Sequence, residues 1–293
     1  MKKIIAIVCH RVTNPLVHTV KYLSTFENNT IVLHVDSKAN KKDFEFLKSK
    51  NTFFTDERVN ITWGGVSQVM ATLELMRFSK SFPYDYFFLI SGDDIPAMSN
   101  EKLDSYLYSN YGKEFIHYQD DRNGYVNPDD RIKFIYPSCF YKRELSLLDR
   151  IKRKFFHKTK RIFYYNNLYA ENSHRLPTFY KGTNWFTLTK SSIDFILDYV
   201  DSNNLYLEVF RNSLCADEVF FHSILKVSGS INFYNNSNAK NNALRYIDWD
   251  SGPQYPRVLD DNDMEKIINS NSFFARKVGE NADEEFMLNC INH

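Results

Sequence analysis

Two short acidic segments carry the side chains best suited to chemistry in this sequence. The first is Ser91-Gly92-Asp93-Asp94, which follows the continuous apolar run YFFLI and is closed by a proline. Neighbouring carboxylates in such a turn can hold a metal ion on a diphosphate, accept hydrogen bonds from sugar hydroxyls, or cap their own backbone. The spacing is not D-x-D, so it favours the metal only weakly.

The second acidic segment is Asp217-Glu218, which opens an apolar helical pattern. A helix N-terminus attracts carboxylates, so capping is one explanation of the pair. The alternative is that Glu218 serves as a general base. His222 lies four residues further on, but the sequence offers no third ligand that would complete a metal site with it.

Cationic and aromatic side chains could complement these carboxylates. Arg257 and Lys277 stand in separate segments and could together clamp a diphosphate, because Arg binds phosphate bidentately and Lys supplies a compact charge. Taken singly, each is an ordinary surface cation. Trp249 and Trp185 could stack on the apolar face of a sugar ring, or they could pack in the core.

The elements that must position these side chains follow from the hydrophobic pattern. Short β-branched or aromatic runs predict strands, and apolar residues at helical spacing predict helices. The predicted strands are 4–8, 30–36, 86–91, 114–118 and 179–189. The predicted helices begin after residue 65 and cover 100–109, 191–199, 217–225 and 260–270, and the segment 273–278 follows the last of them. Strand–helix alternation in the first half predicts an α/β fold with a mostly parallel sheet covered on both faces.

Such a sheet binds ligands beyond the carboxyl ends of its strands. The residues that end or directly follow three predicted strands are therefore candidate ligand contacts. They are His10, then His34, Val35 and Asp36, and then Ser91, Gly92, Asp93 and Asp94.

The composition excludes several classes of protein. The chain has 293 residues, of which 43% are hydrophobic and 25% charged, which rules out collagen, a coiled coil and bulk disorder. Its 37 Lys and Arg nearly balance 36 Asp and Glu, which argues against a nucleic-acid binder. Aromatic residues reach 16%, which is more than a core alone requires.

The sequence predicts a cytoplasmic protein. The N-terminal apolar run stops at His10, short of the about 7–15 residues of a signal peptide, and nowhere do about 20 apolar residues follow one another. The four cysteines are far apart, which predicts neither a disulfide framework nor a zinc site.

A basic run from Arg150 to Arg161 contains the paired aromatics Phe155 and Phe156. One explanation is a solvated helix face. The other is peripheral contact with the inner face of the cytoplasmic membrane or with a lipid-linked acceptor, where each basic residue adds about 1 kcal/mol.

Taken together and in order, the motifs resemble the core-2/I-branching N-acetylglucosaminyltransferase and xylosyltransferase family, glycosyltransferase family 14, and within it the compact bacterial branch. The resemblance covers most of the chain. Its motifs are the first strand ending at His10, HVD at 34–36, WGG at 63–65, SGxDxP at 91–96, KGxxWFxL at 181–188, DE at 217–218, LRYIDW at 244–249, PR at 256–257 and FARK at 274–277.

The resemblance implies a GT-A fold, with a Rossmann-like, mostly parallel sheet and flanking helices, and inverting transfer from a UDP-sugar. It implies that Glu218 is the general base, and that Arg257 and Lys277 neutralise the UDP diphosphate without a divalent metal. It also places the HVD segment near uridine, Asp94 near the donor, and Trp249 at the acceptor sugar.

The sequence therefore predicts one glycosyltransferase domain over 1–293, with a nucleotide-sugar-binding half (1–120) and an acceptor and catalytic half (121–293). The expected donor is UDP-GlcNAc, and the expected acceptor is an oligosaccharide or lipid-linked glycan of a surface polysaccharide or lipopolysaccharide. No cofactor and no nucleic acid is expected. The alternatives are another donor, such as UDP-xylose or UDP-glucuronic acid, or a non-catalytic nucleotide- or carbohydrate-binding module.

Overall fold

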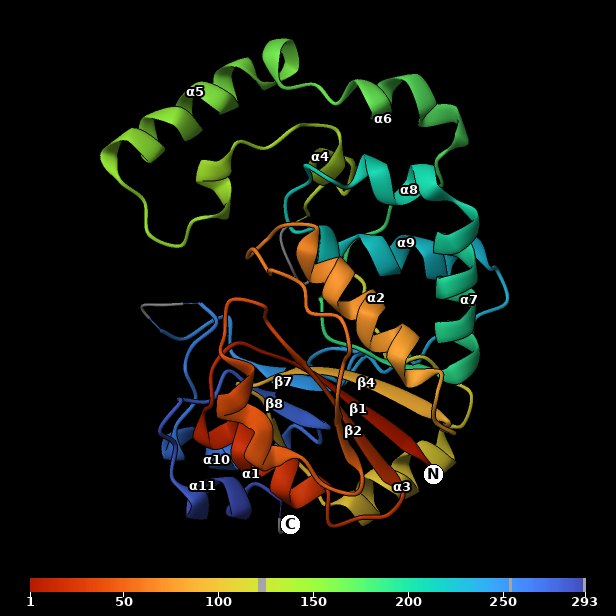
Figure 1. Cartoon of the computed structure of the whole chain (residues 1–293), viewed down its shortest axis with the longest axis vertical. Coiled ribbons are helices and arrows are strands. Elements are labelled where there is room, and N and C mark those ends of the chain that lie inside the picture. Colours follow the sequence, from red (N-terminus) through yellow and green to blue (C-terminus); the bar gives the residue numbers. More distant parts are fainter. Residues whose placement is uncertain (121–124, 253–254, 292–293) are drawn as a thin grey trace.

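A five-stranded sheet lies at the centre of the molecule, in a computed structural model that describes residues 1–120, 125–252 and 255–291 (Figure 1). The strand order is β3-β2-β1-β4-β6. The first four of these strands in chain order are parallel, and β6 runs antiparallel along the outer edge of β4. The strands are β1 (Lys3–Cys9), β2 (Asn29–Val35), β3 (Thr52–Phe54), β4 (Tyr86–Ser91) and β6 (Thr187–Thr189).

Helices cover both faces of this sheet, because alternate residues of each buried strand point to opposite sides. From β1, Ile4 belongs to the same hydrophobic cluster as residues of α2, α7 and α9, whereas Ile5 belongs to the cluster that includes residues of α1 and α3. The helices are α1 (Asn14–Leu23), α2 (Ser67–Ser79), α3 (Asn100–Ser109), α4 (Asp129–Ile132), α5 (Leu147–Phe163), α6 (Asn167–Asn172), α7 (Lys190–Ser202), α8 (Asn204–Val209), α9 (Phe220–Val227), α10 (Met264–Asn269) and α11 (Glu284–Asn289). Short 3-10 turns are η1 (Lys41–Leu47), η2 (Ser138–Tyr141), η3 (Ser173–Arg175), η4 (Ala216–Glu218) and η5 (Asp261–Asp263).

This arrangement confirms the predicted fold class, a Rossmann-like α/β architecture of the GT-A kind with a parallel-rich sheet and flanking helices. The predicted strand at 114–118 is wrong. That segment makes only isolated bridges, to Phe233, Thr187 and Gly182 in turn, so no continuous ladder forms. Its first residue, Glu114, is buried and accepts hydrogen bonds from Thr189 and Ser192.

The predicted strand at 179–189 is shortened to β6 for a related reason. The backbone N–H of Tyr180 donates to the hydroxyl of Ser223, and that of Gly182 donates to the carbonyl of Glu218. Since these donors bond to the η4–α9 segment, they are not available to a sheet. The predicted helix at 217–225 is likewise split into η4 and α9.

A second, three-stranded sheet joins the C-terminal part of the chain to the first. Its order is β5-β8-β7, formed by β5 (Ile95–Pro96), β8 (Phe274–Arg276) and β7 (Arg245–Ile247). Arg245, one of several cations in the C-terminal motifs, is fully buried and donates to the carbonyl of Phe186 at 2.9 Å and to the hydroxyl of Thr187 at 3.0 Å. Its guanidinium therefore links the two sheets and is not exposed to a ligand.

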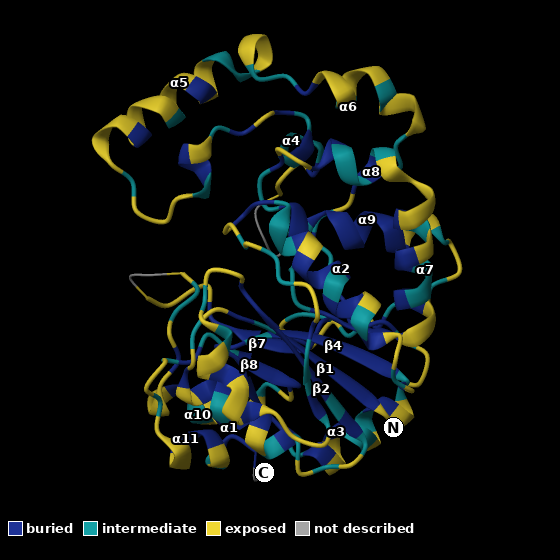
Figure 2. Ribbon diagram, viewed as in Figure 1, coloured by how far each residue is buried: buried dark blue, intermediate teal, exposed yellow. Residues whose placement is uncertain are grey.

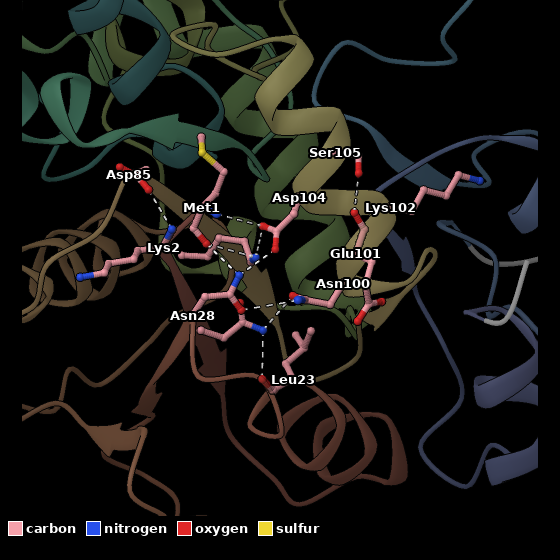
Figure 3. Close-up of polar contacts among 12 residues, drawn as sticks. Met1, Lys2, Leu23, Asn28, Asp85, Asn100, Glu101, Lys102, Asp104 and Ser105 are labelled. Carbon is pink, nitrogen blue, oxygen red and sulfur yellow. Dashed lines mark hydrogen bonds and ion pairs between the residues drawn. The ribbon is translucent and has the colours of Figure 1, made fainter.

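The amino ends of the strands are held by a polar cluster between β1 and α3 (Figure 3). The ammonium of Lys3 is buried and forms an ion pair with Asp104. The side-chain amide of Asn28 donates to Asp104 at 2.7 Å and to the carbonyl of Met1 at 2.9 Å. These bonds satisfy charged groups that would be costly to bury alone, and they lie at the sheet edge opposite the strand ends that carry the site.

The segment from α4 to α6 forms an arm at the end of the molecule farthest from β1 and β2 in Figure 1. A small aromatic core of its own, formed by Phe134, Tyr136, Phe140 and Phe156, holds α5 to this arm. Within the part of the chain that the structure describes, no helix is long and apolar enough to cross a membrane.

Candidate active site

The strand order brings three candidate segments to one place. After β1 the chain builds β2 and β3 on one side, and then returns to place β4 on the other side of β1. Ligands bind at such a reversal, beyond the carboxyl ends of the strands. There the N–H of Gly92 donates to the carbonyl of Val8 at 3.0 Å, and that of Asp36 donates to the carbonyl of Cys9 at 2.8 Å. The ends of β1, β2 and β4 therefore adjoin.

The turn after β4 is built by its own small side chains. The hydroxyl of Ser91 donates to Asp94 at 2.6 Å, and the backbone N–H of Ser91 donates to the other carboxylate oxygen at 3.0 Å. A Cβ on Gly92 would lie only 3.1 Å from the Cβ of Cys9, so glycine lets this turn lie close to β1. Asp94 thus caps the turn, as one sequence-based explanation proposed.

The same turn is lined by cations from β8. The antiparallel register of β5 on β8, continued past the strands, places Asp94 opposite Arg276 and Asp93 opposite Lys277. Both pairs are ion pairs, at 3.3 Å from Arg276 Nε to Asp94 and at 3.2 Å from Lys277 Nζ to Asp93. Arg11, just after β1, also pairs with Asp93 at 3.0 Å. Three cations therefore meet two carboxylates at the strand ends.

Asp94 is fully buried, and the side chain of its partner Arg276 is 14% exposed. Burial raises the pKa of Asp94, and the Arg276 charge and the Ser91 hydrogen bonds oppose that rise. Burial likewise lowers the pKa of Arg276, against the attraction of Asp94. The guanidinium of Arg276 also lies 4.1 Å from the centre of the Trp185 ring, a cation–π contact. One face of Trp185 is therefore covered by an arginine.

Glu218 lies in a second cluster, at the end of η4. Its carboxylate pairs with Lys181 at 3.1 Å and with Arg131 of α4 at 3.3 Å, and its side chain is 30% exposed. The N–H of Gly182 donates to the Glu218 carbonyl at 2.8 Å. A Cβ on Gly182 would lie 1.9 Å from the carbonyl oxygen of His117, so only glycine fits there. Glu218 is thereby held in place while its carboxylate can still be reached from solvent.

Asp217, the other half of the motif, is buried beside Glu218. Gln68 of α2 donates to its Oδ2 at 3.3 Å, and its Oδ1 has no hydrogen-bond partner among the described residues. Burial, and then the charge of Glu218, raise the pKa of Asp217 to about 7. The negative charge of Asp217 also acts on Arg276, so the two clusters lie within electrostatic reach of each other.

The remaining predicted contacts of β1 and β2 lie at the same edge. His34 is buried, and burial lowers its pKa to about 4, so its ring is neutral; it bonds Thr55 and accepts from the N–H of Val59. Val35 is buried in the core. The ring of His10 lies 2.7 Å from Arg11, at the end of β1.

Asp36 follows β2 and accepts from the backbone N–H of Lys38 at 2.9 Å. Two further predicted residues lie in the loops before β8. Arg257 forms ion pairs with Asp263 at 3.0 Å and with Asp260 at 3.4 Å, and its ion pairs include neither Asp93 nor Asp94. Trp249 is 54% exposed, on a loop after β7.

The sequence assigned no role to four basic side chains that the structure places at these clusters. One of them, Arg11, directly follows the predicted contact His10 and pairs with Asp93. Arg276 stands beside the predicted Lys277 in the FARK motif, and Lys181 begins the KGxxWFxL motif, so a motif signal existed for both. Arg131 belongs to no motif, and only the folding of α4 over η4 brings it to Glu218.

In an α/β fold, acidic and basic side chains gathered beyond the strand ends mark a ligand-binding site. A comparison with family models shows the family: the Core-2/I-Branching enzyme model matches residues 6–268, and the chain belongs to this family.

Curated relatives are distant and longer than this chain. The chain is 25% identical over 270 residues to beta-glucuronosyltransferase GlcAT14A of Arabidopsis thaliana, covering 85% of this chain and 55% of that protein. It is 24% identical over 288 residues to xylosyltransferase 2 of Mus musculus, covering 89% of this chain and 30% of that protein. The chain thus spans about half or less of their length. Both names are those of glycosyltransferases, the enzyme class that the sequence predicts.

Among solved structures, a sucrose complex of a Bacillus anthracis protein described as a glucose-1-phosphate thymidylyltransferase aligns at 15% identity and a TM-score of 0.37. The alignment covers 80% of this chain and 86% of that one. A likeness of this size indicates no function.

Proposed function

We propose that this protein is an inverting glycosyltransferase that moves a sugar from a UDP-sugar to a hydroxyl of a glycan acceptor. The observation that carries the proposal is the accessible carboxylate of Glu218, held by Lys181 and Arg131. Its neighbour Asp217 acts electrostatically on Arg276, one of the cations at the strand ends. A base on one side and positive charge on the other are what in-line displacement of a diphosphate requires.

In the proposed mechanism Glu218 accepts the proton of the acceptor hydroxyl as its oxygen attacks the anomeric carbon of the donor. The bond from that carbon to the UDP oxygen breaks, and inversion follows because attack and departure occur on opposite faces. Lys277 and Arg257 stabilise the charge that grows on the leaving diphosphate. To do so, Lys277 would exchange its present partner Asp93, and Arg257 its partners Asp260 and Asp263, for phosphate oxygens.

Metal-independent transfer is part of the proposal. One feature supports it: the carboxylates of Asp93 and Asp94 are each paired with basic side chains. A divalent ion would have to displace these basic side chains in order to bind the two carboxylates.

The donor is proposed as UDP-GlcNAc, with UDP-xylose and UDP-glucuronic acid as alternatives that the names of the relatives favour. The acceptor is proposed as an oligosaccharide or a lipid-linked glycan of a cell-surface polysaccharide or lipopolysaccharide. A lipid-linked acceptor lies at a membrane, so peripheral membrane contact belongs to the same proposal.

A donor panel tests the proposal directly. Purified protein is incubated with each of the three UDP-sugars, with and without cell-envelope oligosaccharides, and release of UDP is measured. Acceptor-dependent release from one donor is the expected result, and the anomeric configuration of the product, read by NMR, should be inverted. UDP binding without release from any donor, with any acceptor, would instead identify a binding module.

A further inference from the structure

Helix α5 presents apolar side chains to solvent along one side. Leu147, Leu148, Ile151, Phe155 and Ile162 are each between 52% and 78% exposed, and we name these five residues the α5 apolar stripe. At 100° per residue they fall within about 100° of one another around the helix axis. Figure 2 shows that most of α5 is exposed, at the outer end of the arm.

The opposite side of α5 is packed firmly, so the stripe does not result from a poorly held helix. Phe156 is 1% exposed, and its ring lies 4.7 Å from that of Phe140 and 5.0 Å from that of Tyr136. Arg153 donates to the carbonyl of Cys139 at 2.9 Å. The two adjacent phenylalanines noted in the sequence therefore have different environments. Phe156 belongs to the core, and only Phe155 faces outward.

Cations border the stripe. Arg150, Lys152, Lys154, Lys158 and Arg161 are exposed, and none of them forms an ion pair within the described part of the chain. On the helix, Lys154 and Arg161 lie on one flank of the stripe, Lys152 on the other, and Lys158 within it. An apolar stripe flanked by Lys and Arg is the pattern of helices that lie in the surface of an anionic bilayer.

We propose that α5 docks on an anionic lipid surface, with its axis in the plane of the interface, the α5 apolar stripe among the acyl chains and the flanking cations on the headgroups. The positive charge of α5 favours an anionic lipid surface over a second copy of the chain as its binding partner. A symmetric contact of α5 with α5 would bring ten unpaired cations together at one interface, and like charges repel. Anionic headgroups neutralise the same cations.

The position of the arm gives this docking a consequence for the site. Arg131 of α4 reaches Glu218, and the charge of Arg143, just before α5, acts on His10 at the end of β1. The membrane-facing helix therefore belongs to the same arm that borders the site. Docking would hold the site close to the lipid surface, where a lipid-linked glycan would be found.

Vesicle co-sedimentation tests the docking without any substrate. The protein is mixed with vesicles of phosphatidylcholine alone, or of phosphatidylcholine with about 30% phosphatidylglycerol, at about 0.1 M and about 1 M salt. We expect binding to the anionic vesicles at least about ten-fold stronger than to the neutral ones. High salt should weaken it, because the Debye length falls from about 10 Å to about 3 Å.

Two variants and a control assign the binding to the stripe. The double substitution Ile151→Glu and Phe155→Glu affects only exposed side chains, so it should leave the melting temperature nearly unchanged and lower vesicle binding about ten-fold or more. Lys154→Glu with Lys158→Glu should remove the preference for anionic lipid. Phe46→Glu, at an equally exposed phenylalanine on η1, should bind like the wild type.

Three results would overturn the docking. They are equal binding to both kinds of vesicle, no binding to either, and a wild-type oligomer that the Ile151 and Phe155 substitutions convert to a monomer in light scattering. The last result would show that the stripe is a contact between protein chains. UDP release with a soluble acceptor, measured on the same variants, separates this docking from the proposed reaction, because either can fail alone.

Discussion

Replacing Glu218 by glutamine tests the proposed base with little change of shape. The substitution weakens two ion pairs, at 3.1 Å to Lys181 and at 3.3 Å to Arg131. All three side chains are partly exposed, and pairs of that kind contribute about 0–1 kcal/mol each. The variant should therefore lose at most about 2 kcal/mol of unfolding free energy, and it should fold.

The effect on catalysis should be much larger than the effect on stability. General-base assistance contributes about 10²–10⁴ in rate, which corresponds to about 3–5 kcal/mol in the activation barrier. Glu218→Gln should lower kcat by that range while the Kd for UDP stays nearly the same, because the diphosphate is held by other residues. Steady-state UDP release gives kcat, and isothermal titration calorimetry with UDP gives the Kd.

The matched control is Glu208→Gln on α8. Glu208 also pairs with an arginine, Arg211, and both side chains are exposed at the surface. The Glu208→Gln variant should keep the wild-type kcat. If Glu218→Gln retains the kcat of this control at an unchanged melting temperature, Glu218 is not the base and the proposed mechanism is refuted.

Three further predictions concern the buried acid, the cation clamp and the metal. Since burial raises the pKa of Asp217 to about 7 from an ordinary value of about 4, ionising it in the folded state costs about 4 kcal/mol. The unfolding free energy should therefore fall as pH rises from about 4 to about 7 and level off above that. Urea unfolding at several pH values should show a weaker pH dependence of this free energy for Asp217→Asn than for the wild type. An equal pH dependence in the two proteins would contradict the raised pKa of Asp217. Lys277→Ala should raise the Kd for UDP about ten-fold or more, whereas Lys190→Ala, which removes a surface pair with Asp194, should not. Treatment with EDTA should leave UDP release unchanged, and a loss that Mn²⁺ restores would move the diphosphate to the carboxylates of the turn after β4.

The local sequence pattern predicted the bounds of a strand or helix correctly where one continuous segment formed the whole element. The strand Tyr86–Ser91 and the helix Asn100–Ser109 have the predicted bounds, because a continuous apolar run buries itself on both faces and because Ser99 caps the helix by accepting from Lys102. The strand β3 escaped prediction, since three residues carry no usable period. The segment 114–118 has a strand-like composition, but its partners come from three different parts of the chain, which no local pattern reveals.

The sequence by itself determined the α/β class, the family and the two acidic motifs, because each of these is written in short segments of neighbouring residues. Only the tertiary structure decided how the motifs are partnered. Arg276 and Lys277 reach the turn after β4 through the register of β5 on β8, and Arg131 reaches Glu218 across 87 residues of chain. Side-chain pairs of this kind depend on how sheets and helices pack, and residues so far apart in sequence share no period or spacing that could show the contact in advance.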